Sequence, residues 1–255
     1  LSSGVKDMDP DSDDARFWKV TKREYEKQTK VSPEFVAEFA RVSTVAQSVW
    51  EKAKAKSDFK SFQPHLEKLV ELRRQYADFF KPWDHVYDPL LDDFEPGMKT
   101  VEVQEIFNNL RPKQVELIKA ISGKPQVDRS FLSLEYPAEK QREFGEMVIS
   151  QFGYDWSHGR QDESVHPFTS GFGLNDVRIT TRFNPQYLPS ALFSTMHECG
   201  HALYELGIDK KYNRSLLGGG ASMAVHESQS SSPTCSIGIH ALPWKHHPPT
   251  TSGCI

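Results

Sequence analysis

Hydrophobic positions between Asp13 and Phe152 recur every three or four residues, the spacing of one face of an α-helix. The run Ser32-Pro33-Glu34 is typical of a helix start, because serine caps and proline suits the first turn. We expect the apolar positions to form a helix-bundle core. They are Phe35, Phe39, Val42, Ala46 and Trp50; Leu66, Leu69, Val70, Tyr76, Ala77 and Phe80; Val103, Ile106, Phe107 and Leu110; Val115, Ile118 and Ile121; and Phe144, Met147, Val148 and Phe152.

Two segments depart from one continuous helical period. Pro112 is expected to end one helix and open the next, because proline cannot donate its backbone hydrogen bond inside a helix. Between Asp155 and Phe183, glycines and aromatic residues replace the helical spacing. Residues 177–183 alternate apolar and polar side chains, which predicts a strand in a small sheet. We hypothesise that the edge of this strand pairs with an extended peptide.

A later helical stripe carries the most specific chemistry in the chain. Leu192, Met196, Cys199, Leu203 and Leu206 recur at helical spacing. Cys199 lies about 200° around the helix from the histidine two positions before it, so we expect it to face the core.

Within that stripe, His197-Glu198-Cys199-Gly200-His201 places two histidines four residues apart on one helix face. Glu227, thirty residues after His197, can supply a third ligand. Two histidines and a glutamate hold zinc with a position left for water, whose pKa the ion lowers to about 7. Glu198 is then placed to accept the proton of that water and pass it to the leaving amine.

The same residues also allow an interpretation in which no metal is bound. Histidines four residues apart also occur as solvated or core residues, and the five-residue pattern can arise by chance. The amphipathic helix around the pattern favours the metal site.

Composition narrows the class of protein. The chain has 255 residues, of which 37% are hydrophobic and 26% charged, as expected for one or two globular domains. A net charge of -4 without a clustered basic surface argues against nucleic-acid binding. No apolar run is long enough for a membrane span, and the N-terminal sequence has no secretory signal pattern. Three cysteines without framework spacing favour a reducing compartment, and hence the cytoplasm.

Several segments together resemble the carboxypeptidase Taq family of zinc metallocarboxypeptidases, also called thermostable carboxypeptidase 1. The resemblance covers roughly residues 13–230. It is carried by Asp176-Val177-Arg178-Ile179-Thr180, HECGH at 197–201 and His226-Glu227-Ser228-Gln229, with support from His166-Pro167-Phe168, Phe193-Ser194-Thr195-Met196, Tyr87-Asp88-Pro89-Leu90-Leu91-Asp92 and Glu95-Pro96-Gly97-Met98.

The resemblance implies a mainly α, multi-helix zincin-like fold with a small β-sheet near the zinc helix. It also implies a homodimer that removes single C-terminal residues from peptides with a free C-terminus. His197, His201 and Glu227 match the metal ligands, and Glu198 matches the general acid and base. Cobalt or manganese could replace zinc.

Residues that match the active-site region of the family are candidates for substrate binding: Asp176, Arg178, Thr180, His166 and His226. A carboxypeptidase must hold a terminal carboxylate, for which arginine is the natural partner, so Arg178 and Arg182 are candidates. Either arginine could instead be a surface residue or an ion-pair partner of Asp176. His226 could contact substrate or orient a metal ligand.

The sequence departs from the family after Ser230. Serine, proline, histidine and threonine replace the helical pattern, and the family's later motifs are not visible. We therefore expect a disordered start at residues 1–12, a partial catalytic region at residues 13–230 and a disordered tail at residues 231–255. Leu1 suggests that the sequence begins inside a longer product, and a frameshift, retained intron or alternative exon would explain the tail.

Two other functions stay open. The chain could be a truncated, inactive product that acts as a binding or regulatory subunit. It could also be a zinc endopeptidase or aminopeptidase, which shares the two histidines and a distant glutamate.

Overall fold

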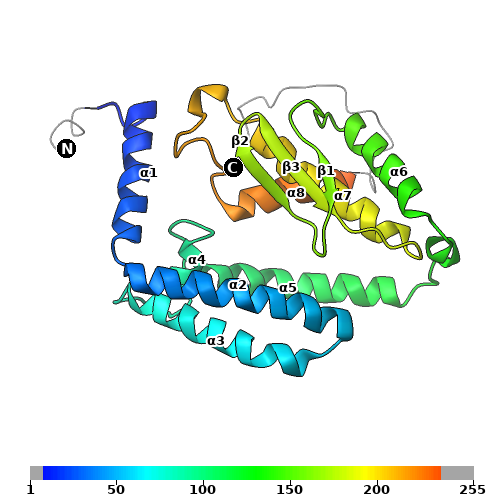
Figure 1. Cartoon of the computed structure of the whole chain (residues 1–255), viewed down its shortest axis with the longest axis horizontal. Coiled ribbons are helices and arrows are strands. Elements are labelled where there is room, and N and C mark those ends of the chain that lie inside the picture. The colour runs from blue at the N-terminus through cyan, green and yellow to red at the C-terminus, as the bar shows by residue number, and fades with distance from the viewer. Residues whose placement is uncertain (1–7, 237–255) are drawn as a thin grey trace. The chain divides into compact units, whose positions relative to one another are not determined.

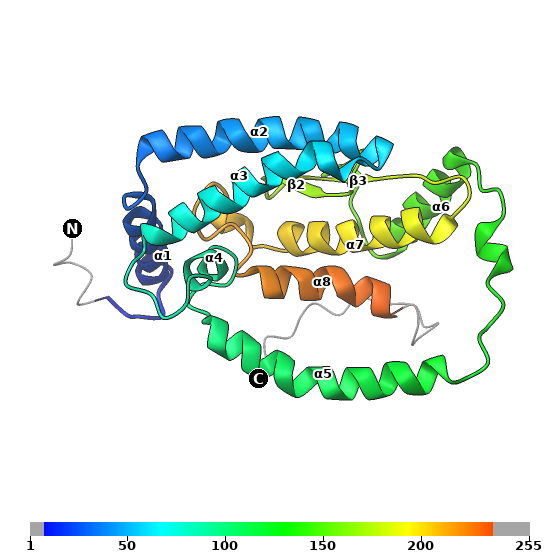
Figure 2. The same cartoon turned by 90° about the horizontal axis from the view of Figure 1, so that it is seen from below.

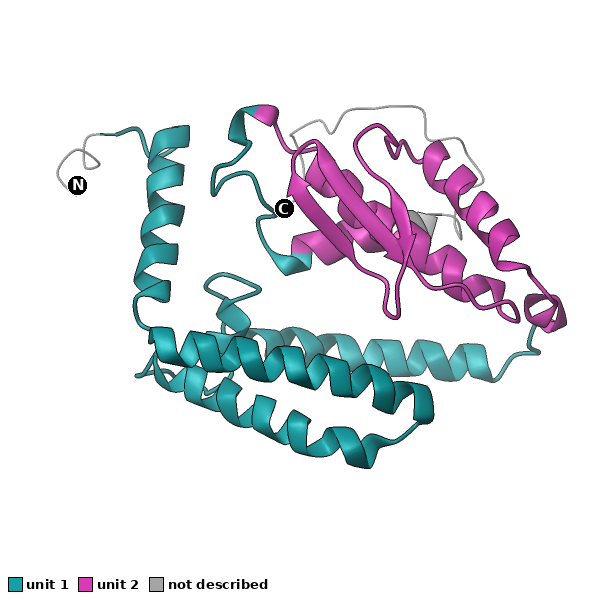
Figure 3. Ribbon diagram, in the orientation of Figure 1, with its two compact units in different colours: residues 1–127, 211–224 teal, residues 128–210, 225–255 magenta. Residues whose placement is uncertain are grey.

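The computed structural model describes residues 8–236, with side chains described up to Ser231. The chain divides into two compact units, residues 1–127 with 211–224 and residues 128–210 with 225–255 (Figure 3). The described elements of the first unit are the helices α1 Asp13–Gln28, α2 Pro33–Lys56, α3 Phe59–Asp78, α4 Asp88–Asp92 and α5 Thr100–Ser122 (Figure 1).

The helix pair α2 and α3 forms the best packed part of the first unit, and the two helices lie side by side (Figures 1 and 2). The Ser32 hydroxyl caps α2 by accepting a hydrogen bond from the Phe35 amide, as predicted. Val42 and Ala46 are buried, also as predicted. The Phe35 ring packs edge-on against Phe79 with ring centroids 5.2 Å apart, which ties α2 to the end of α3.

Two predictions for the long helices are wrong. The helix α5 is continuous from Thr100 to Ser122 with Pro112 inside it. The fixed φ of proline is compatible with helical backbone, so one lost hydrogen bond need not end a helix. No residue of α5 is buried, so its apolar side chains do not form the expected core. In α3 the buried leucine is Leu72, whereas Leu66 and Val70 are exposed.

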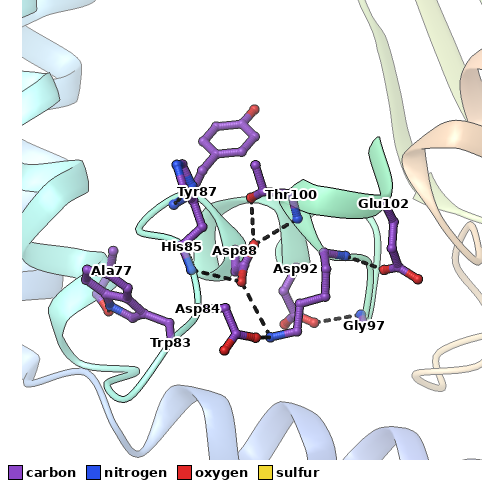
Figure 4. Close-up of polar contacts among 11 residues, drawn as sticks. Ala77, Trp83, Asp84, His85, Tyr87, Asp88, Asp92, Gly97, Thr100 and Glu102 are labelled. Atoms are coloured by element: carbon purple, nitrogen blue, oxygen red, sulfur yellow. Dashed lines mark hydrogen bonds and ion pairs between the residues drawn. The ribbon is translucent and has the colours of Figure 1, made fainter. Parts of the chain in front are cut away.

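Asp88 fastens α4 to the start of α5 (Figure 4). The residue is 5% exposed, and its carboxylate accepts hydrogen bonds from the Thr100 amide at 2.8 Å, the Thr100 hydroxyl at 2.6 Å and the His85 amide at 3.3 Å. The ammonium of Lys99 lies 3.5 Å away. Burial raises the pKa of Asp88, but these hydrogen bonds outweigh it and lower that pKa to about 2.

Replacing Asp88 by asparagine is expected to lower the free energy of unfolding at pH 7 by about 1–2 kcal/mol. Because the native pKa is depressed below 3.8, this stabilisation is present above about pH 4 and is lost as pH falls towards 2. Urea unfolding at pH 7 and pH 3 measures the effect. Asp84→Asn, at an exposed ion pair with Lys99, is the control. An equal pH dependence in wild type and Asp88→Asn would contradict the assignment.

The second unit contains a short sheet covered by helices. Its elements are η1 Ser130–Ser133, α6 Ala138–Gln151, β1 Gln161–Glu163, β2 Thr169–Gly173, β3 Asp176–Thr181, α7 Leu188–Leu206 and most of α8 Met223–Ser236; η2 Lys210–Tyr212 lies at the boundary between the units. The strand order is β1-β3-β2, with β1 parallel and β2 antiparallel to β3. The predicted small sheet is therefore confirmed.

The place of β3 in the sheet corrects one hypothesis. The Ile179 residue of β3 pairs with Gln161 on one side and with Thr169 on the other, so β3 is the central strand. Its backbone groups are used within the sheet and are not available to a peptide. Only β1 or β2 can offer an edge.

The core of the second unit lies between β3, α6 and α7. It comprises Ile149, Tyr154, Val177, Ile179, Cys199 and Ala202, with Phe152, Leu203 and Leu206 packed against it. The prediction that Cys199 faces the core is confirmed. In α6 the buried positions are Gln141, Gly145 and Ile149, whereas Phe144 and Met147, expected to be inside, are exposed.

Candidate metal centre

The helix α7 presents the predicted metal ligands on the side away from its core residues. Pro189 lies in its first turn, and its C-terminal cap is Gly207. His197 and His201 are one helical turn apart, with ring centroids separated by 4.8 Å and ring planes at 88°. His197 is partly exposed and His201 is buried, so one imidazole faces solvent while the other is fixed by packing.

Glu227 of α8 completes a group of three ligand atoms. Its carboxylate oxygens lie 3.6 Å from His197 Nε2 and 3.8 Å from His201 Nε2. The three ligand atoms are all within 4.8 Å of one another, and no other group of this kind exists among the described residues. Ligands of a tetrahedral zinc ion are about 3.3 Å apart. The donor set therefore fits a divalent metal, and its spacing fits one after the three ligand atoms move slightly closer together.

The position of Glu227 depends on a close approach between α7 and α8, which lie side by side in Figures 1 and 2. A Cβ atom at Gly200 would lie 2.5 Å from Ser230 Cα and 2.6 Å from the Gln229 carbonyl oxygen. Only glycine fits at this contact, because the opposing atoms belong to the backbone. Ser230 is fully buried. The glycine inside the histidine motif thus brings the third ligand to the other two.

Glu198 lies beside the ligands in a largely enclosed place. It is 7% exposed, and its Oε2 accepts a hydrogen bond of 2.7 Å from the Thr169 hydroxyl of β2. Burial raises the pKa of Glu198, and the bond from Thr169 and the proximity of His197 oppose that rise. A carboxylate with a raised pKa beside a metal site is suited to taking up and releasing a proton.

His226 has both ring nitrogens engaged. Its Nδ1 lies 2.6 Å from His201 Nδ1, and its Nε2 lies 2.8 Å from a carboxylate oxygen of Glu205. Burial lowers the pKa of His201, and the neighbouring His226 lowers it further. Both effects favour the neutral imidazole, which is the form that binds a metal.

A family model for the carboxypeptidase Taq (M32) metallopeptidases matches residues 3–253. The chain belongs to this family. It is 39% identical over 225 residues to Carboxypeptidase 1 of Bacillus subtilis (strain 168). This match covers 87% of this chain and 44% of that protein. It is 36% identical over 233 residues to Thermostable carboxypeptidase 1 of Thermus thermophilus, covering 88% of this chain and 46% of that protein.

The M32 structures share the fold. The match to the crystal structure of BsuCP has a TM-score of 0.83 at 38% identity and covers 86% of this chain and 44% of that one. The match to the M32 carboxypeptidase from Deinococcus radiodurans R1 has a TM-score of 0.79 at 39% identity and covers 91% and 46%. The expected mainly helical fold with a small sheet is confirmed. The chain spans less than half of the length of these relatives.

Two findings concern the rest of this M32 chain. The helix α8 continues to Ser236, beyond Ser230 where the helical pattern was predicted to end. The Ser230 hydroxyl donates to the Glu227 carbonyl oxygen, and its burial against α7 holds the helix where apolar periodicity is absent.

The described helices include none with the length and apolar character of a membrane span. Residues 1–7 and 237–255, most of the predicted disordered ends, lie outside the described residues.

The family motif on β3 does not contact the predicted ligands. Asp176 and Arg178 form a two-bond ion pair with distances of 2.8 and 2.7 Å, and the guanidinium lies over the Phe172 ring. The Thr180 hydroxyl is bonded to Ser164 and to Phe168. These side chains alternate with the core-facing Val177 and Ile179 and so lie on the other face of the sheet. Their substrate role stays a prediction.

His166 is exposed, and its Nδ1 lies 2.7 Å from the neighbouring Pro167 carbonyl oxygen. The ring is close enough to Glu198 to contribute to lowering the pKa of that carboxylate. A part in substrate binding is compatible with this position and stays a prediction.

Thr169 and Glu205 belong to the site and were not singled out from the sequence. Glu205 follows His201 by four residues, as His201 follows His197. The same helical spacing therefore predicts that Glu205 lies on the face of the two histidines. Thr169 directly follows the family motif at 166–168, but no spacing rule connects it with Glu198. Only the fold of β2 against α7 brings these two side chains together.

Proposed function

We propose that this chain is the metal-binding part of a zinc-dependent carboxypeptidase that releases single C-terminal residues from peptides. The convergence of His197, His201 and Glu227, with Glu198 beside them, carries the proposal. Zinc suits two imidazoles and one carboxylate, and cobalt or manganese are alternatives. A bound divalent ion would supply Lewis-acid activation of water and of the peptide carbonyl.

The chain's own residues divide the remaining work. Glu198 accepts the proton of the attacking water and delivers it to the leaving amine. The Thr169 hydroxyl holds the carboxylate of Glu198 in place through its 2.7 Å bond. For the substrate carboxylate we propose Arg178 on the family resemblance alone, because its exposed guanidinium is paired with Asp176 and lies on the face of β3 opposite the core-facing Val177 and Ile179. A peptide carboxylate would have to share or replace that partner.

Peptides with free and amidated C-termini test this function. A carboxypeptidase releases the last residue of the free peptide and leaves the amidated peptide intact. Cleavage of both peptides would indicate the endopeptidase or aminopeptidase alternative. Retention of metal without cleavage of either would favour the inactive, regulatory product, which the coverage of less than half of the relatives keeps open.

Two further properties are proposed on narrower grounds. Homodimerisation follows from the family resemblance, and analytical ultracentrifugation of the purified chain checks it. A cytoplasmic location is proposed because the three cysteines lack the spacing of a disulfide framework, which favours a reducing compartment.

A further inference from the structure

His226 lies between a predicted metal ligand and a carboxylate. The distances are 2.6 Å from His226 Nδ1 to His201 Nδ1 and 2.8 Å from His226 Nε2 to Glu205 Oε1. All three side chains are well covered, with exposed fractions of 11% for His201, 16% for His226 and 21% for Glu205. The three residues therefore form a continuous hydrogen-bonded chain that is partly shielded from water.

The chemistry of the partners determines the direction of these bonds. A carboxylate accepts but does not donate, so His226 must donate its Nε2 proton to Glu205. When Nε2 carries the single ring proton of His226, Nδ1 has a lone pair that accepts a hydrogen bond from His201 Nδ1. His201 then keeps its ring lone pair on Nε2, the atom that faces Glu227.

We propose that Glu205 and His226 are positioning residues that fix the tautomer and ring orientation of His201 for metal binding. This inference rests on the metal site of the proposed function. The opposite arrangement, with His226 donating from Nδ1, would put the His201 proton on Nε2 and remove the lone pair that the metal needs. It would also leave Glu205 without its donor.

Packing holds the middle residue of the chain. The Tyr204 ring lies edge-on to His226, with centroids 4.9 Å apart and planes at 83°. With both nitrogens of His226 occupied, the ring has no donor for substrate. The geometry thus favours the orienting role of His226 over the substrate contact expected from its motif.

Metal affinity of the full chain tests the proposal. We expect Glu205→Ala and His226→Ala each to weaken zinc binding about 10–100-fold in competition with a chelator. Because Glu205 acts through His226, the double variant should bind no more weakly than His226→Ala alone. Glu146→Ala, at another partly buried glutamate of the same unit, is the matched control and should bind like wild type.

Histidine tautomers provide a readout that needs no metal. Long-range proton–nitrogen NMR of the metal-free chain should show the Nδ1–H tautomer for His201 and the Nε2–H tautomer for His226. Glu205→Ala should convert His201 to a mixture of tautomers, with an unchanged thermal midpoint showing that the fold is kept. A conservative Glu205→Gln, which retains an acceptor oxygen, should recover most of the affinity.

Three results would overturn the proposal: opposite tautomers in wild type, unchanged zinc affinity in both single variants, or additive losses in the double variant. None of them would bear on the proposed peptidase activity. Conversely, a chain that binds zinc, shows the expected losses of affinity in the variants and cleaves no peptide would contradict the proposed function. The positioning role of Glu205 and His226 would still hold.

Discussion

Glu198→Gln is expected to lower the rate of release of a C-terminal residue by about 10²–10⁴-fold. Glutamine has the shape of glutamate and can still accept the bond from Thr169, so the geometry of the site should be kept. It cannot take up the proton of the attacking water. Metal content should therefore stay at the wild-type value while the rate falls.

Steady-state hydrolysis of a free peptide, measured with metal content on the same preparation, checks this expectation. Thr169→Val is a useful companion variant, because it removes the hydroxyl that holds Glu198 but leaves the carboxylate. We expect a smaller loss of rate there. A Glu198→Gln protein with wild-type rate would show that another group moves the proton.

Gly200→Ala is expected to weaken zinc binding by at least about 10-fold. The added methyl group would meet Ser230 Cα at 2.5 Å and the Gln229 carbonyl oxygen at 2.6 Å. Backbone atoms cannot rotate away, so α8 must shift and carry Glu227 with it. Metal sites tolerate displacements of only about 0.2 Å in ligand distance, and overpacking of this kind costs about 1–3 kcal/mol of stability.

Isothermal titration with zinc, together with thermal unfolding, measures both effects. Gly171→Ala on β2 is the matched control, because a Cβ atom there would meet nothing within 4 Å. It should bind zinc like wild type. Unchanged affinity in Gly200→Ala would show that the close approach of α7 and α8 does not position the third ligand.

Local signals made much of this fold predictable. The Ser32-Pro33 start of α2, the alternation in β3 and the histidine spacing on α7 each depend on neighbouring residues only, and each is confirmed. The choice of ligands also follows from sequence, because residues four apart on a helix must share a face. Glu227 required a resemblance or a three-dimensional contact.

Long-range packing limited the rest. In α3 and α6 the apolar side chains surround more than one face, so spacing alone could not tell that Leu72 and Ile149 would be buried while Val70 and Met147 would be exposed. The interior position of Pro112 in α5 depends on whether the remaining helical bonds outweigh one lost bond. Strand order is equally non-local, which is why β3 was expected at an edge.

The hydrogen-bonded chain of His201, His226 and Glu205 also combines what the sequence predicts with what only long-range packing shows. Sequence placed His226 next to Glu227 and left two roles open, since adjacent residues on a helix point in different directions. The distances to His201 and Glu205 resolve the direction of its ring. Helical spacing from His201 also points to Glu205. Its role became apparent only from the packing of α8 against α7, which places His226 beside it.

Metal content per purified chain tests the central claim most directly, with Glu227→Ala measured alongside. The account predicts about one zinc per wild-type chain, retained through dialysis, and loss of that zinc in the variant because two imidazoles alone hold the ion weakly. Wild-type chain without bound zinc, or equal zinc in the Glu227→Ala variant, would contradict the assignment of His197, His201 and Glu227 as a metal centre.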